Sequence, residues 1–136
     1  MIAIDASVFV SALLPEDVHH QTSLEFISGL MERGDQAVAP ALVLCEVASA
    51  VSRRTGRRNL AREAAADVRR FGFLTLISVD ARLAEDAASV AADRGFRGAD
   101  ATYVAVAIEH AKRLVTWDRD QAARADGLVA AGPPAT

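Results

Sequence analysis

Two kinds of hydrophobic pattern alternate along the chain. Short, nearly continuous apolar runs predict buried strands at residues 2–6, 36–39, 74–79, 114–117 and 128–131. Between them, apolar residues recur every three or four positions, which predicts helices at residues 8–14, 18–33, 41–54, 60–71, 81–94, from residue 98 onward, and after Asp118 or Asp120. Strands that alternate with helices indicate an α/β fold with a mainly parallel sheet.

Glycine and aspartate mark several of the expected helix ends. Gly34, Gly56 and Gly95 follow the last periodic positions of three helices, and Asp80 stands where a helix cap belongs. The periodicity also predicts which residues face the core. In the second, third and sixth helices these are Leu24, Ile27, Leu30 and Met31; Leu44, Val47, Ala48 and Val51; and Val104, Ala107, Ile108 and Ala111.

Acidic residues stand at the ends of two predicted strands. Asp5 ends the first strand, Asp118 follows the strand at 114–117, and Asp100 opens the helix before that strand. Because functional groups in parallel α/β sheets gather outside the carboxyl ends of the strands, we expect these three acids to converge on one edge. Glu46 points roughly 160–200° away from the apolar stripe of its own helix, so its carboxylate does not face the core.

These acids admit two interpretations. Carboxylate oxygens without nitrogen or sulfur ligands suit Mg²⁺ or Mn²⁺, hard cations that take one or two carboxylates and keep several waters. A metal held in this way activates water and stabilises charge on a reacting phosphodiester. Alternatively, Asp5, Asp100 and Asp118 are helix N-caps, and Glu46 is an ordinary solvated glutamate. Spacing alone leaves both interpretations open.

Composition narrows the class of protein. At 136 residues, with 51% hydrophobic and 24% charged residues, the chain suits one globular domain, which we place at residues 1–131 with a flexible tail at 132–136. No apolar run approaches the roughly 20 residues that cross a bilayer, and the N-terminus has no basic leader, so we expect a cytoplasmic protein without membrane contact. A single cysteine excludes an internal disulfide and a multi-thiolate zinc site. The net charge of −3 argues against bulk attraction to nucleic acid, but not against a nuclease whose acids hold metal.

Four segments together resemble the motifs of a known family. Residues 4–8 (IDASV) place an acid after a hydrophobic strand, and residues 42–47 (LVLCEV) place one glutamate after aliphatic residues of a helix. Residues 98–107 (GADATYVAVA) open a helix with an acid, and residues 115–120 (VTWDRD) place a threonine two positions before an aspartate. In this order, and in a chain of this length, the segments resemble the PIN-domain family and, within it, the VapC-type toxins.

The resemblance implies a three-layer α/β/α sandwich and an endoribonuclease that depends on Mg²⁺ or Mn²⁺. By position, Asp5, Glu46, Asp100 and Asp118 correspond to the family's four acids. Asp5 and Asp118 would bind metal most directly, and Asp100 would bind it directly or through water. Glu46 would bind a second metal or orient the attacking water.

The same motifs contain two hydroxyls and a further acid. Ser7 and Thr116 would fix the orientation of the carboxylates, and Asp120 is either an extra acid or a helix cap. The resemblance also implies an antitoxin protein that blocks the acidic site. It implies a homodimer as well, for which the helices at 18–31 and 60–71 are candidate surfaces.

An arginine cluster is the candidate for RNA binding. Arg53, Arg54, Arg57 and Arg58 end the Glu46 helix and its following turn, and Arg53 lies on nearly the same helix face as Glu46. The cluster would guide an RNA backbone to the acids, or it is a solvated helix end whose cations suit the helix dipole. The histidines show no metal-ligand spacing. Trp117 is interpreted as a packing residue, with stacking on a base as the alternative.

Other α/β classes fit the same residues less well. A haloacid-dehalogenase phosphatase needs a second acid two residues after the first, where Ser7 stands. A dinucleotide-binding domain and a P-loop need a glycine-rich turn after the first strand, which residues 5–8 lack. The remaining alternative is a non-catalytic PIN-like module that binds RNA or a protein partner without cutting.

Overall fold

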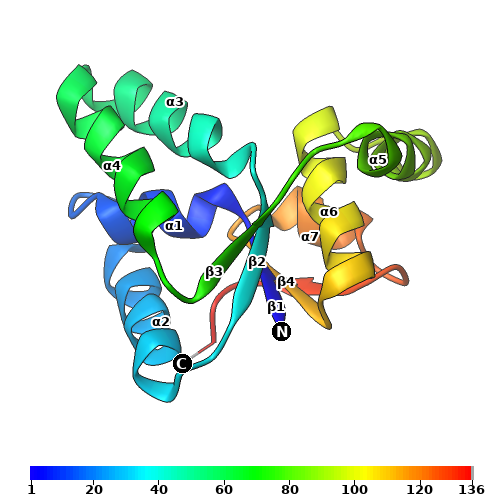
Figure 1. Cartoon of the computed structure of the whole chain (residues 1–136), viewed down its shortest axis with the longest axis horizontal. Helices are drawn as coiled ribbons and strands as arrows, with labels where there is room; N and C mark the ends of the chain where they lie inside the picture. The colour runs from blue at the N-terminus through cyan, green and yellow to red at the C-terminus, as the bar shows by residue number, and fades with distance from the viewer. Residues whose placement is uncertain (136) are drawn as a thin grey trace.

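A five-stranded parallel sheet forms the centre of the computed structural model, which describes residues 1–135 (Figure 1). Its strands are β1 (Ile2–Ile4), β2 (Ala37–Pro40), β3 (Leu74–Ile77), β4 (Arg113–Val115) and β5 (Ala130–Gly132). They lie in the order β3-β2-β1-β4-β5, and every neighbouring pair is parallel. The predicted α/β class is confirmed, and the sheet is parallel throughout.

Helices cover both faces of this sheet. In Figure 1, one side carries α1 (Ala6–Leu13), α2 (His20–Arg33), α3 (Val43–Thr55) and α4 (Arg58–Arg70). The other side carries α5 (Ala81–Arg94), α6 (Gly98–His110) and α7 (Arg119–Arg124). Parallel strands need crossover connections, and these helices supply them. The fold is therefore the three-layer α/β/α sandwich that the resemblance implies.

The first strand of the chain occupies the middle of the sheet. Ala3 of β1 lies in register with Val38 of β2 on one side and with Leu114 of β4 on the other. The N–H of Asp5 continues the ladder by donating to the carbonyl of Val115 at 2.9 Å. Asp5 and the residues that follow β4 therefore lie side by side at the carboxyl edge of the sheet.

The first helix begins earlier than its apolar pattern predicts. Residues 2–6 are predicted as a strand, but β1 stops at Ile4 and α1 starts at Ala6 rather than at residue 8. The reason is a cap, because the Asp5 carboxylate accepts a hydrogen bond from the Ser7 N–H at 2.9 Å. The strand thus ends where the candidate acid begins.

Two of the predicted core faces are wrong in detail. On α3 the fully buried positions are Val43, Val47 and Val51, whereas Leu44 is only partly buried. On α6 every residue from 101 to 107 is buried, and Ile108, predicted to face the core, is 47% exposed. Helix α6 lies between the sheet and α5, so its middle is covered all round and a single apolar stripe does not describe it.

The prediction for α2 is half right. Ile27 and Leu30 are buried in the core, but Leu24 and Met31 are exposed. The two exposed side chains line a shallow apolar groove between α2 and α4, together with Phe71. Helix α2 therefore presents apolar surface to solvent as well as to the core.

The end of the described chain lies against the sheet. Gly132 belongs to β5, one residue beyond the predicted domain limit. The carbonyl of Pro133 accepts a hydrogen bond from Arg113 at 2.5 Å, and Pro134 is buried. Thr136, the last residue of the predicted tail at 132–136, lies outside the described residues. No helix within residues 1–135 combines the length and the apolar character needed to span a membrane.

Candidate active site

Asp5 lies at the junction of β1 and α1 and is only 7% exposed. Its Oδ2 accepts a hydrogen bond from the Ser7 N–H at 2.9 Å, and its Oδ1 lies 3.5 Å from Nε2 of Gln121. Burial raises the pKa of Asp5, and the contacts with Ser7 and Gln121 oppose this only in part. Repulsion from Asp118 adds to the increase.

Asp118 stands directly beyond β4, at the start of α7. Its Oδ1 accepts a hydrogen bond from the Gln121 N–H at 3.0 Å and so caps the helix. Its own N–H donates to Oγ1 of Thr116 at 3.0 Å. Asp5 and Asp118 therefore cap their helices and also lie close enough for their charges to interact, so the two sequence interpretations are compatible.

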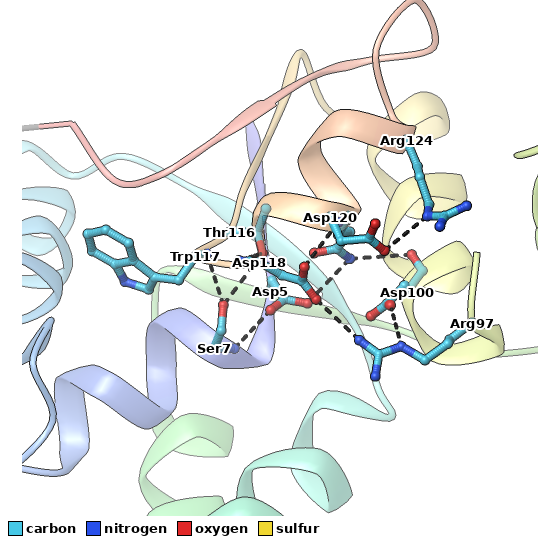
Figure 2. Close-up of polar contacts among 10 residues, drawn as sticks. Asp5, Ser7, Arg97, Asp100, Thr116, Trp117, Asp118, Asp120 and Arg124 are labelled. Carbon is cyan, nitrogen blue, oxygen red and sulfur yellow. Dashed lines mark hydrogen bonds and ion pairs between the residues drawn. The ribbon is translucent and has the colours of Figure 1, made fainter. Parts of the chain in front are cut away.

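The hydroxyls of Ser7 and Thr116 lie beside these carboxylates, 3.5 Å from each other (Figure 2). Oγ of Ser7 accepts a hydrogen bond from the N–H of Trp117 at 3.1 Å, as Oγ1 of Thr116 does from the N–H of Asp118. Both hydroxyls thus hold the main chain that carries Asp118. The N–H of Ser7 donates to the Asp5 carboxylate, and the Ser7 side chain also acts to lower the pKa of Asp5.

Asp100 lies in the first turn of α6 and is linked to Asp118 by an arginine, Arg97, that was not predicted from the sequence. Arg97 donates from Nε to Oδ2 of Asp100 at 3.2 Å and from Nη2 to Oδ2 of Asp118 at 3.3 Å (Figure 2). Burial raises the pKa of Asp100, while the Arg97 charge acts against the increase. The Arg97 side chain is 78% exposed, so this bridge lies at the mouth of the site and is weak.

Glu46 reaches the same region from α3. It is half-buried, and its Oε1 is a buried atom with no hydrogen-bond partner among the described residues. The hydroxyl of Tyr103, fully buried on α6, faces Glu46 and is also unpartnered within residues 1–135. Burial raises the pKa of Glu46 and repulsion from Asp5 and Asp100 adds to this, while the Tyr103 hydroxyl acts against the increase.

A groove of about 510 Å³ joins three of the four predicted acids, which come from the N-cap of α1, from α3 and from α6. Its lining includes Asp5, Glu46 and Asp100, and we call it the acidic groove. Asp118 does not line the groove, but it follows Trp117, which does, and its charge raises the pKa of Asp5. It also shares Arg97 with Asp100. The structure thus brings all four predicted acids to one edge of the sheet.

The donor chemistry of these acids fits a hard divalent cation. The set consists of oxygens only, its members raise one another's pKa, and the buried Oε1 of Glu46 lacks a partner. Within residues 1–135, no three side chains of aspartate, glutamate, histidine or cysteine lie as close together as in a preformed metal site. In this arrangement Arg97 lies between Asp100 and Asp118 and pairs with both. A bound cation would take over the charge that Arg97 supplies in this arrangement.

Three residues of the site were not predicted from the sequence. Arg97, Tyr103 and Gln121 each contact or face one of the acids. Spacing gives a signal for Arg97 alone, which lies three positions before Asp100 and contacts it. The side chains of Tyr103 and Gln121 reach acids of other elements, Glu46 and Asp5.

The four predicted RNA-binding arginines lie in two places. Arg53 and Arg54 line the acidic groove, whereas Arg57 and Arg58 line a separate hollow at the turn between α3 and α4. Arg54 forms an ion pair with Asp17, with Nη1 and Oδ2 2.8 Å apart. Arg53 forms no ion pair with any described residue, so its charge remains available to a ligand in the groove.

Asp120, the possible extra acid, does not line the acidic groove, although its charge acts on Arg97. It pairs with Arg124 at 2.9 Å, and its side chain is 65% exposed. Its position offers a control for the loss of a carboxylate outside the acidic groove.

Fold and site together define an α/β/α domain whose carboxylates meet at the carboxyl edge of a parallel sheet. The sequence profile of the PIN domain matches residues 2–127. The chain belongs to the PIN-domain family, which confirms the resemblance carried by the four motifs.

Solved structures with the same fold include VapC toxins. VapC20 of Mycobacterium tuberculosis, described as a sarcin-ricin loop cleaving toxin, is 26% identical with a TM-score of 0.76, over 95% of this chain and 97% of that one. VapBC2 of Rickettsia felis, solved with a DNA fragment from its promoter, is 19% identical with a TM-score of 0.66, over 97% and 98% of the two chains. FitAcB of Neisseria gonorrhoeae is 19% identical with a TM-score of 0.70, over 98% of each chain. The last two comparisons show the fold alone. No curated protein sequence matches the chain significantly.

Proposed function

We propose that this protein is a metal-dependent endoribonuclease and the toxin of a type II toxin–antitoxin pair. The observation that carries the proposal is the meeting of Asp5, Glu46, Asp100 and Asp118 at one edge of the sheet. Membership of the PIN-domain family and the likeness to a toxin that cleaves the sarcin-ricin loop support RNA as the substrate. The reaction is hydrolysis of an RNA phosphodiester bond.

Each acid has a role in this proposal. Asp5 and Asp118 would hold Mg²⁺ or Mn²⁺, with Asp100 as a direct or water-mediated ligand. Bound there, the ion would lower the pKa of water and stabilise the charge that develops on the phosphate. Burial raises the pKa of Glu46, which suits Oε1 to orient the attacking water and accept its proton. Ser7 and Thr116 keep the chain around Asp118 in place.

The proposal includes two protein partners, an antitoxin that covers the acidic groove and a second copy of the chain. The structure of VapBC2 with a fragment of its own promoter supports the first by analogy. The exposed Leu24 and Met31 of α2, beside Phe71 at the end of α4, support apolar contact with one of these partners. These helices are the surfaces expected from the sequence.

The decisive experiment incubates purified protein with total cellular RNA and maps the new ends. We expect endonucleolytic cleavage with Mg²⁺ or Mn²⁺ and none with excess EDTA, because the acids alone cannot activate water at neutral pH. Asp120→Asn, which removes a carboxylate outside the acidic groove, is expected to cleave like the wild type. A protein that leaves every RNA intact with both metals, yet binds RNA or a protein tightly, would be a non-catalytic PIN-like module.

Arg53 is expected to contact the RNA backbone. Arg53→Ala should weaken RNA binding similarly for all sequences and reduce the salt-dependence slope by about one, since one phosphate contact is lost. Fluorescence anisotropy over a series of salt concentrations measures both quantities. Arg69→Ala, at an exposed position on α4, is the matched control and should leave the slope unchanged. An unchanged slope for Arg53→Ala would mean that Arg53 only lies on a solvated helix end and does not contact RNA. The same measurement on Arg57→Ala tests whether the hollow at the α3–α4 turn binds RNA.

A further inference from the structure

An aromatic pair lines the acidic groove next to Asp118, and the chemistry assigned to the acids does not use it. The rings of His19 and Trp117 are stacked, with centroids 3.6 Å apart and planes inclined by 6°. Both residues line the groove together with Asp5 and Glu46. Because Trp117 directly precedes Asp118 in the chain, the stack lies in the part of the groove that adjoins the end of β4.

Trp117 is held at both of its N–H groups. Nε1 of the indole donates to Oγ of Ser23 at 2.8 Å, and the main-chain N–H donates to Oγ of Ser7 at 3.1 Å. Ser23 is itself fully buried and lies 2.6 Å from the hydroxyl of Ser11. The indole is therefore fixed in orientation, and Figure 2 shows it directed away from the carboxylates of Asp5 and Asp118.

His19 covers the indole from the loop between α1 and α2, and this loop is tied to α3. The His19 N–H donates to Oδ1 of Asp17 at 2.8 Å, and Oδ2 of Asp17 pairs with Arg54 at 2.8 Å. Burial on its own would raise the pKa of Asp17, but the His19 N–H and Arg54 lower it, so this carboxylate stays charged and keeps the link. The stack is thus positioned from three directions, by the loop, by α3 and by the end of β4.

From this geometry we propose that the His19–Trp117 pair is a stacking platform for an unpaired base of single-stranded RNA, an inference that rests on the proposed ribonuclease function. A flat ring in a groove accepts any base, because every base has a π-face. Arg53 of α3 has no ion-pair partner among residues 1–135, and it supplies the cation for the backbone of the same strand. The bases of a duplex have no free face, so the platform selects RNA with an unpaired nucleotide close to the scissile phosphate.

The platform is tested by binding, measured in the Asp5→Asn background so that the RNA stays intact. The probes are a short labelled single-stranded RNA and the same sequence annealed to its complement. His19→Ala removes the ring but keeps the main-chain N–H bond to Asp17, and it should weaken single-strand binding about tenfold while leaving duplex binding unchanged. His19→Phe keeps a flat ring and should bind within about twofold of the parent, as should the matched control His110→Ala at the far end of α6. Trp117 is the only tryptophan, so its fluorescence should change when the single strand binds but not when the duplex binds.

Each other outcome overturns a defined part of the argument. Equal binding by His19→Ala and its parent, or an equal loss in His19→Phe and His19→Ala, removes the stacking platform while leaving the nuclease assignment in place. Circular dichroism on each variant separates such a result from unfolding. If the wild type cleaves no RNA with either metal and its Asp5→Asn form binds neither probe, the proposed function itself is wrong.

Discussion

Asparagine in place of Asp5 is expected to reduce RNA cleavage at least about a thousandfold, because a metal ligand contributes several kcal/mol to the stabilisation of charge in the transition state. The fold should survive. Asparagine caps helices about as well as aspartate, so its side-chain oxygen still accepts the Ser7 N–H that begins α1. Gln121 adapts as well, since its amide can turn and present the unpartnered Oε1 to the new NH₂ group.

The measurement is the cleavage rate under single-turnover conditions with Mn²⁺, for the wild type, Asp5→Asn, Asp118→Asn and Asp120→Asn. The first two variants should lose activity, and Asp120→Asn should keep it, since that carboxylate pairs with Arg124 in solvent. A folded Asp5→Asn protein that cleaves at the wild-type rate would reduce Asp5 to a helix cap.

The second large effect is the change in the free energy of unfolding caused by Asp5→Asn. Without metal the variant should be more stable than the wild type, and with metal it should be less stable. In the metal-free protein Asp5→Asn should raise the free energy of unfolding at neutral pH by about 1 kcal/mol, since one of several mutually repelling charges is removed. With Mn²⁺ at about a hundred times its Kd, the wild type should gain about 2.7 kcal/mol and the variant almost nothing. Thermal or urea unfolding with and without Mn²⁺ measures both changes.

The pH dependence follows from the same carboxylates. The pKa of Asp5 in the folded protein is raised above its ordinary 3.8, so the folded state binds this proton more tightly than the unfolded chain does. The contribution of Asp5 to the free energy of unfolding is therefore largest at low pH and declines as the pH rises from about 4 through the pKa of Asp5 in the folded protein. The raised pKa values of Glu46 and Asp100 act in the same direction. Asp5→Asn should flatten this decline, whereas Asp120→Asn should not. Parallel pH profiles for both variants and the wild type would contradict the assignment of Asp5 to a charged cluster.

The sequence predicts most of the fold and the four acids because their signals are local. Alternating strands and helices place β1 and β4 in one parallel sheet, and an acid at the end of each strand then belongs at the same edge. The capping roles of Asp5 and Asp118 are readable as well, since a cap lies next to its helix.

What the sequence does not predict depends on contacts between distant segments. Arg97 bridges Asp100 to Asp118, Gln121 reaches back to Asp5, and neither contact follows from spacing until the sheet order is known. The same holds for the core faces. Ile108 is exposed because α6 is covered by the sheet and α5 only along its middle, and periodicity within one helix carries no information about where its neighbours end.

The central place of β1 in the sheet has a consequence for how the protein is made. Residues 2–5 leave the ribosome long before one of their two neighbouring strands, β4, which is at residues 113–115. Until β4 has been made, the edge of β1 that β4 covers in the folded protein is open, and Asp118 is absent from the site. Contacts of such long sequence separation form late and slowly. A protein built in this order lacks its complete set of acids until residue 118 has been made, so the proposed nuclease activity is absent while residues 1–117 are synthesised.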